Sequence, residues 1–190
     1  MKKILLCGAV AAMACGTVAS GQAFAATQTR NMTQIGANMC TLSIPSTDTK
    51  VRPKAVGYGN EGTTNAFVIC SFGSPPGGQV SSADFSVARL LLKSMDGATH
   101  SVTCTAVNSA ADGATVGLPA PQYVSKTTSV NNSGPAGAYG TFVEWTPQDF
   151  GAAAGTTIPW SAGFFSMTCI LPPQVAIKIG YAQTKEDVGS

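Results

Sequence analysis

The stretch that decides the fold is Ala66-Phe67-Val68-Ile69-Cys70-Ser71-Phe72, a short apolar run that contains one cysteine. Turn-forming residues bound it on both sides, at 60–65 and at 73–78. A run rich in β-branched and aromatic residues between such boundaries predicts a strand buried on both faces. Three less apolar stretches share this design, each around a cysteine: 38–44, 101–107 and 164–171.

The order of these segments predicts an all-β fold. Strand-like segments recur about every ten residues with turn formers between them, and none is a convincing amphipathic helix. Asp96-Gly97, between alternating segments at 85–95 and 101–107, predicts a β-hairpin. A helix over 86–94 is the alternative for the first of these, because its residues have good helical propensity, but no cap precedes it. We therefore expect a single antiparallel β-sandwich, or a flattened barrel, of about nine strands.

The N-terminus predicts export. Met1-Lys2-Lys3 is a positive start, an apolar run follows, and Ala23-Phe24-Ala25 is a cleavage site of small residues. A membrane anchor fits less well because glycines interrupt the run, and lipidation at Cys15 lacks the usual aliphatic residue before it. We expect a cut after Ala25 and a secreted or periplasmic protein with no stable membrane insertion.

The charge balance and length limit the kind of protein. The chain has 190 residues, with 11 Lys+Arg against 9 Asp+Glu, and two of the lysines leave with the signal. The mature chain is then neutral, which gives no reason to expect nucleic-acid binding. We expect a signal at 1–25, a flexible N-terminal tail or weak edge strand at 26–36, one sandwich domain at 37–182 and a C-terminal tail at 183–190.

The mature chain keeps four cysteines: Cys40, Cys70, Cys104 and Cys169. An even number in an exported chain predicts two disulfides, and no pair has metal-ligand or redox-motif spacing. Four cysteines allow three connectivities. Strands that follow one another in the sequence are usually neighbours in a sheet, which favours the pairing Cys40–Cys70 with Cys104–Cys169. We expect no cofactor and no metal.

Two groups of side chains are candidates for ligand binding. Exported sandwiches often stack aromatic rings on sugars, and the glycan candidates are Trp145, Trp160, Gln148 and Asp149. The alternative is that both tryptophans belong to the core. The polyanion candidates are Lys50, Arg52 and Lys54, three cations on one side of an extended segment. The alternative for these is an edge strand protected by Lys and Pro against pairing.

No complete catalytic arrangement is evident. His100 is the only histidine in the chain and follows the Asp96-Gly97 turn, and no Gly-x-Ser-x-Gly elbow is present. Glu144 and Asp149 could form an acid and base pair. A cross-strand partnership between Glu144 and Lys126 explains the strand carboxylate equally well. We therefore expect a protein that is not an enzyme.

The run Asn38-Met39-Cys40-Thr41-Leu42-Ser43-Ile44-Pro45, with Val51-Arg52-Pro53-Lys54 and Asn65-Ala66-Phe67-Val68-Ile69-Cys70, resembles small exported proteins of Gram-negative bacteria. The resemblance implies no activity and no site residues. Pilin subunits are also exported, disulfide-linked sandwiches, but residues 26–36 are polar where a donor strand is apolar.

These observations first favour a non-enzymatic exported sandwich with a role in surface structure or protein interaction. A carbohydrate- or polyanion-binding module is the alternative, and a secreted hydrolase is the distant third. The expected partner is a surface polysaccharide or another exported protein.

Overall fold

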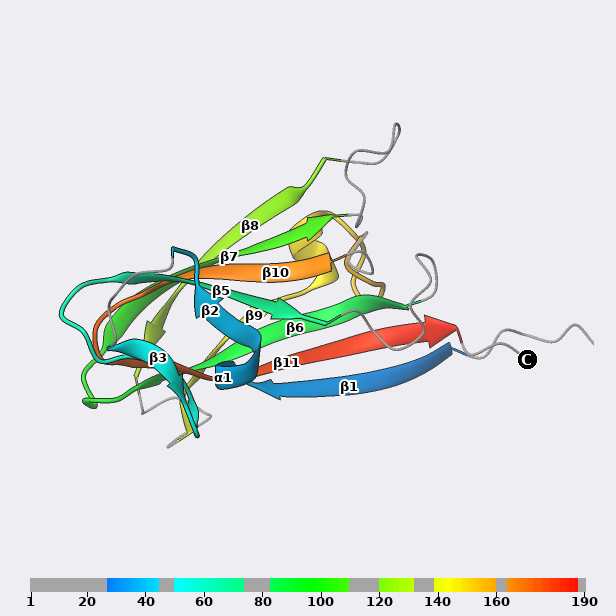
Figure 1. The fold of residues 1–190 in the computed structure, drawn as a ribbon. Coiled ribbons are helices and arrows are strands. Elements are labelled where there is room, and N and C mark those ends of the chain that lie inside the picture. The colour runs from blue at the N-terminus through cyan, green and yellow to red at the C-terminus, as the bar shows by residue number, and fades with distance from the viewer. Residues whose placement is uncertain are drawn as a thin grey trace, which may run out of the picture.

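The computed structural model describes residues 27–44, 50–73, 83–109, 120–131, 139–159 and 164–187. Over these residues two antiparallel sheets pack face to face, which confirms the predicted all-β sandwich (Figure 1). The strands and helices are β1 (Thr27–Ile35), α1 (Gly36–Met39), β2 (Cys40–Leu42), β3 (Val51–Lys54), β4 (Gly57–Asn60), β5 (Ala66–Phe72), β6 (Ala83–Ser94), β7 (His100–Ser109), β8 (Gln122–Val130), β9 (Thr141–Trp145), the 3₁₀ turn η2 (Pro147–Phe150), β10 (Phe164–Leu171) and β11 (Val175–Asp187). No helix among the described residues is long and apolar enough to cross a membrane.

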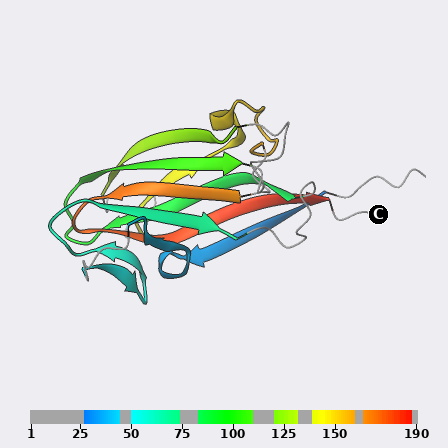
Figure 2. The same ribbon diagram turned by 45° about the horizontal axis from the view of Figure 1, so that its top comes forward.

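The two sheets differ in how their strands follow the chain. The five-stranded sheet has the order β2-β5-β10-β7-β8. The six-stranded sheet has the order β3-β4-β11-β6-β9, and β1 also pairs with β11. Because β4 pairs with β11 over 175–177 and β1 pairs with it over 179–187, one long strand has two successive neighbours on the same side. Figure 2 shows β1 running beside the far half of β11.

Inward side chains of both sheets form one apolar core. Strands β6 and β11 supply fully buried residues at alternate positions, as the period of a half-buried strand requires. The rings of Phe72, Phe85, Phe165 and Phe150 pack in sequence, with centroids 5.6–6.0 Å apart, and link the two sheets. The largest wholly buried side chains are Trp145, Phe85, Phe165, Leu90, Leu92, Ile158 and Met167.

The structure confirms both disulfides and the favoured pairing. Cys40–Cys70 and Cys104–Cys169 each join residues that stand directly opposite one another on neighbouring strands of the five-stranded sheet. All four cysteines are buried. Both links therefore hold β2 to β5 and β7 to β10 within one layer, and neither joins the two sheets.

The predicted hairpin at Asp96-Gly97 is wrong. The chain does turn there, and Gly97 has the positive φ of 79° that the turn needs. However, β6 belongs to the six-stranded sheet and β7 to the five-stranded sheet, so the two strands do not pair. The turn is an arch from one layer to the other, because both strands have an apolar face that must reach the shared core.

Two further expectations need correction. Of the two alternatives for 26–36, the edge strand is confirmed, because Thr27–Ile35 forms the nine-residue strand β1. The predicted C-terminal tail needs correction, because β11 extends through most of it. Each supplies the other's backbone hydrogen bonds, so neither segment needs many apolar residues. The strand β5 has the predicted bounds but is not buried on both faces, because Phe67 is 51% exposed and Ser71 is exposed.

Candidate functional site

Trp145 lies in the core and not at a binding surface. Its side chain is 0% exposed, and its indole Nε1 donates a hydrogen bond of 3.0 Å to the carbonyl oxygen of Val124. This bond joins β9 to β8, the neighbouring edge strands of the two sheets. An enclosed indole offers no face to a sugar ring, so Trp145 is no longer a glycan candidate. Trp160 lies outside the described residues.

Asp149 is part of the same junction between the sheets. Lys126 Nζ on β8 donates 2.7 Å hydrogen bonds to Asp149 Oδ2 and to the backbone oxygen of Glu144. The Thr146 amide donates to the same carboxylate oxygen at 2.7 Å. Burial raises the pKa of the Asp149 carboxyl, but the bonds from Lys126 and Thr146 outweigh it and hold the pKa below its ordinary value. Asp149 therefore has a structural role, while Gln148 beside it is exposed.

The three polyanion candidates do not form a row of free cations. Arg52 and Lys54 lie on the edge strand β3, and both pair with Glu61: Arg52 Nη2 is 3.7 Å from Oε2, and Lys54 Nζ donates to Oε1. The hydrogen bond from Lys54 is the main cause of a lowered pKa of Glu61. Lys50 is exposed and precedes the strand. One carboxylate thus offsets part of the positive charge of this segment.

The catalytic candidates are also engaged in structural contacts. His100 Nε2 lies 2.8 Å from Asp96 Oδ1, and the same oxygen accepts hydrogen bonds from Ser94 Oγ and the Ala98 amide. These contacts hold the arch between β6 and β7. Among the described residues, no three His, Cys, Asp or Glu side chains converge as a metal site would require.

The most developed surface feature is the outer side of the six-stranded sheet. There, side chains from four neighbouring strands form a continuous polar and aromatic surface, which we call the binding face. Its residues are Asn31 on β1, Tyr181 and Gln183 on β11, Arg89 on β6, and Phe142 and Glu144 on β9.

Arg89 is at the centre of the binding face. It stands opposite Tyr181 on one side and Glu144 on the other. Its guanidinium carbon lies 4.5 Å from the centroid of the Tyr181 ring and 5.4 Å from that of Phe142. Cation–π contacts of this kind contribute about 0.5–1 kcal/mol each at exposed sites. Arg89 Nε is 3.3 Å from Glu144 Oε2. The guanidinium is therefore fixed between two aromatic rings and a carboxylate.

Hydrogen bonds extend this arrangement to β1. Tyr181 Oη donates to Asn31 Oδ1 at 2.6 Å, and Gln183 Nε2 donates to the same oxygen at 3.2 Å. Ser86 Oγ on β6 donates to Gln183 Oε1 at 3.1 Å. The polar groups are held in place by one another before any ligand arrives, while the Phe142 ring remains 45% exposed.

The sequence analysis missed the binding face. Its members come from segments separated by up to 152 residues, and each alone is an ordinary outward residue of a half-buried strand. The signal that was available is the alternation of Phe142 and Glu144 with Val143 and Trp145, which places the first two on the side of the strand opposite Trp145.

No family model matches this chain, and no curated protein matches it. Among solved structures, it is similar to the family 11 carbohydrate-binding module from Clostridium thermocellum, determined in complex with a β-1,3-1,4-mixed-linked tetrasaccharide. The sequences are 16% identical, the match covers 83% of this chain and 87% of that one, and the TM-score is 0.32. At this TM-score the likeness carries no weight for function.

Proposed function

We propose that this protein is an exported carbohydrate-binding module that is not an enzyme, and that it binds glycans on the outer side of its six-stranded sheet. The observation that carries this proposal is the row formed by Tyr181, Arg89 and Phe142, with its exposed ring and its fixed guanidinium. Binding sites typically combine aromatic surface with a few well-placed polar groups, and the binding face has this composition.

The chemistry of the face suits a ligand rich in hydroxyl groups. A sugar ring has apolar C–H faces that pack on an exposed ring such as Phe142, and hydroxyls at its rim that both donate and accept hydrogen bonds. The guanidinium of Arg89 donates, the carboxylate of Glu144 accepts, and the amide of Gln183 does both. Because these groups already hold one another, little conformational entropy is lost when they meet a ligand.

The remaining features support export and a non-catalytic role. Two buried disulfides suit an oxidising compartment, where the expected signal would deliver the chain. Glu144 on β9 pairs with Arg89 on β6, while Asp149 in η2 pairs with Lys126 on β8. The two carboxylates are therefore engaged by different cations, which disfavours their use as an acid and base pair.

The test is a binding assay with a panel of bacterial and plant polysaccharides, by affinity electrophoresis first and calorimetry for any glycan that retards the protein. We expect Phe142→Ala to weaken binding about tenfold, equivalent to about 1.4 kcal/mol, without unfolding the protein. Tyr123→Ala is the matched control, because Tyr123 is an aromatic residue 69% exposed on β8 of the other sheet.

Two results would contradict the proposal. One is equal affinity of Phe142→Ala, Arg89→Ala and the unaltered protein for every glycan bound. The other is no binding to any glycan at millimolar concentration. In the second case the role in surface structure or protein interaction, favoured first by the sequence, would be the better account.

A further inference from the structure

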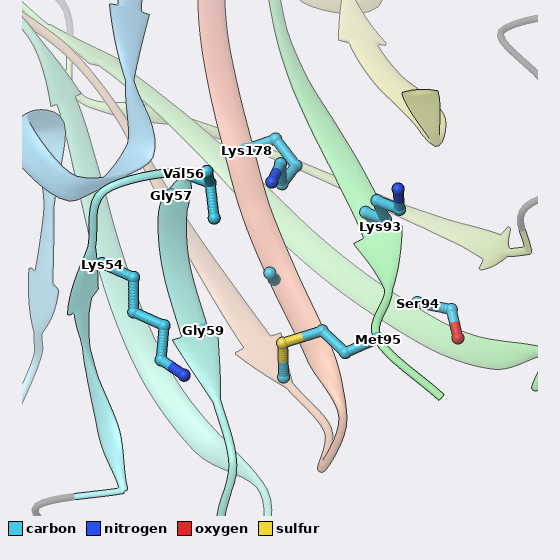
Figure 3. Close-up of a pocket in the computed structure, with 9 residues that line it drawn as sticks. Lys54, Val56, Gly57, Gly59, Lys93, Ser94, Met95 and Lys178 are labelled. Atoms are coloured by element: carbon cyan, nitrogen blue, oxygen red, sulfur yellow. The ribbon is translucent and has the colours of Figure 1, made fainter. Parts of the chain in front are cut away.

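A hollow lies on the same outer side, at the other end of the sheet. It has a volume of about 430 Å³ and is formed by strands β3, β4, β6 and β11 (Figure 3). Its floor is made of small residues, because Gly57, Gly59 and Ala176 present almost no side chain. Gly57 has a φ of 143°, and a Cβ there would collide with the carbonyl oxygen of Ile177, so this part of the floor requires glycine.

Three lysines stand around the hollow. Lys54 borders it from β3, Lys93 from β6 and Lys178 from β11, as Figure 3 shows. Ala176 on β11 pairs with Lys93 on β6 and, on its other side, with Gly59 on β4. The small residues of the floor therefore lie between the lysines across the sheet. Three strand spacings of about 4.8 Å separate β3 from β6, a width of about 14 Å.

Lys54 and Lys178 do not each have a carboxylate of their own among the described residues. Lys54 shares Glu61 with Arg52, which leaves two cations for one carboxylate. Within the described ranges, no carboxylate lies within ion-pair distance of Lys178. Burial lowers the pKa of Lys178, and the nearby positive charge of Lys93 lowers it further. An anion in the hollow would offset both effects, because it would stabilise the ammonium group of Lys178.

We propose that this hollow binds the anionic group of an acidic polysaccharide, a carboxylate or a sulfate, while the neighbouring sugars lie on the binding face. The inference rests on the proposed function and gives it a substrate class: acidic glycans in preference to neutral ones. Ammonium groups bind such anions through charge-assisted hydrogen bonds.

The position of the hollow supports one continuous site. Arg89, Leu91 and Lys93 occupy alternate outward positions of β6, so Lys93 follows Arg89 on the same side by about 13 Å. On β11, the register with β6 shifts between Ile177 and Ile179, so Lys178 and Tyr181 lie on the outer side although they are three residues apart. A glycan chain that follows the strands would meet the aromatic row first and the lysines next.

The experiment compares two ligands that differ only in charge: oligogalacturonate and its methyl-esterified form, each titrated by calorimetry into the oxidised protein. We expect the unaltered protein to bind the free acid about tenfold more tightly. The double substitution Lys93→Gln with Lys178→Gln should remove this preference and leave binding of the ester unchanged. Lys178→Gln alone is compared with Lys185→Gln as its matched control, because each removes one charge from the same strand.

A second variant separates the hollow from the general charge of the surface. Gly59→Val keeps every lysine but places a side chain in the floor, where a Cβ would lie 3.4 Å from Met95 Sδ without a backbone clash. We expect it to weaken binding of the free acid as strongly as the lysine substitutions do. A sulfated glycan in the same titration tells whether sulfate or carboxylate is preferred.

The outcomes separate the two proposals. Equal affinity for the acid and the ester, with Phe142→Ala still harmful to both, would refute the hollow and keep the binding face. Equal weakening by Lys185→Gln and Lys178→Gln would assign the preference to overall charge and also refute the hollow. No binding of either ligand or of any glycan in the panel would refute both.

Discussion

Replacing Trp145 by phenylalanine tests whether this residue holds the two sheets together at their β8–β9 edge. The substitution removes the indole N–H that bonds the Val124 carbonyl at 3.0 Å, together with part of a side chain that is 0% exposed. Losing one partner of a buried hydrogen bond costs about 1–3 kcal/mol. The missing ring atoms add about 1–2 kcal/mol, at about 0.8 kcal/mol for each buried methylene equivalent.

We therefore expect Trp145→Phe to lower the free energy of unfolding by about 2–5 kcal/mol. Urea unfolding with disulfides intact measures this. With an m-value of about 2 kcal/mol/M, the midpoint should fall by about 1–2.5 M. Tyr123→Ala, at a residue 69% exposed on β8, is the control and should change stability by no more than about 0.5 kcal/mol.

The same variant gives a direct optical readout. The chain has two tryptophans, so Trp145→Phe leaves Trp160 as the single indole, and the difference between the proteins reports Trp145. We expect that difference spectrum to resist acrylamide and to be unchanged by glycans. A midpoint shift below about 0.3 M, or a glycan-dependent change in the Trp145 signal, would refute the assignment of this residue to the core.

The remaining predictions concern the disulfides and the arch. The disulfide between β7 and β10 spans 65 residues and the one between β2 and β5 spans 30, so the chain-entropy model gives stabilisations of about 4.3 and 3.6 kcal/mol respectively. Alanine substitution of the β7–β10 pair should therefore lower the urea midpoint more than substitution of the other pair. The reverse order would contradict the entropic account. Hydrogen bonds from His100, Ser94 and the Ala98 amide lower the pKa of Asp96 from 3.8 to about 2. Because this pKa is lower in the folded state, the contribution of the Asp96 carboxylate to stability is present above about pH 4 and is lost as the pH falls toward 2. Asp96→Asn should therefore lose less stability over that interval than the unaltered protein. Parallel pH profiles of the two proteins would show that these hydrogen bonds do not stabilise the ionised carboxylate.

The sequence predicted the local features of this fold and missed those that depend on sheet assignment. The bounds of β5 follow from composition and turn chemistry, which act over a few residues. The two disulfides follow from an even number of cysteines and from the tendency of sequential strands to be neighbours. Asp96-Gly97 correctly marked a turn. A turn sequence does not state which sheet each strand joins, so the arch was mistaken for a hairpin.

The sequence left β1 undecided between a tail and an edge strand for a different reason. Apolar alternation identifies strands that bury a face, and most residues of Thr27–Ile35 are exposed. What holds β1 is nine residues of backbone pairing with β11, and backbone pairing leaves no trace in the pattern of side chains. Because β1 supplies Asn31, this open choice hid one edge of the binding face as well.

The candidate site was missed because its parts are joined by cross-strand register. Arg89 meets Tyr181 and Glu144 only because β6 lies between β11 and β9, an order that does not follow the sequence. The hollow depends likewise on small residues of β4 and β11 becoming neighbours. Reading the sequence alone directed attention to Trp145 because tryptophan is rare and large, and those same properties favour a place in the core.

The period of β6 explains why binding and stability can be altered separately on this sheet. Leu90 and Leu92 are 0% exposed and fix the strand to the core, while Arg89 and Lys93 lie on the opposite side of the strand. A substitution of either cation therefore leaves the inward packing intact, and loss of glycan affinity in such a variant reports lost contacts with the ligand. A substitution of either leucine removes the support on which those contacts stand, and should reduce affinity only to the extent that it unfolds the sheet.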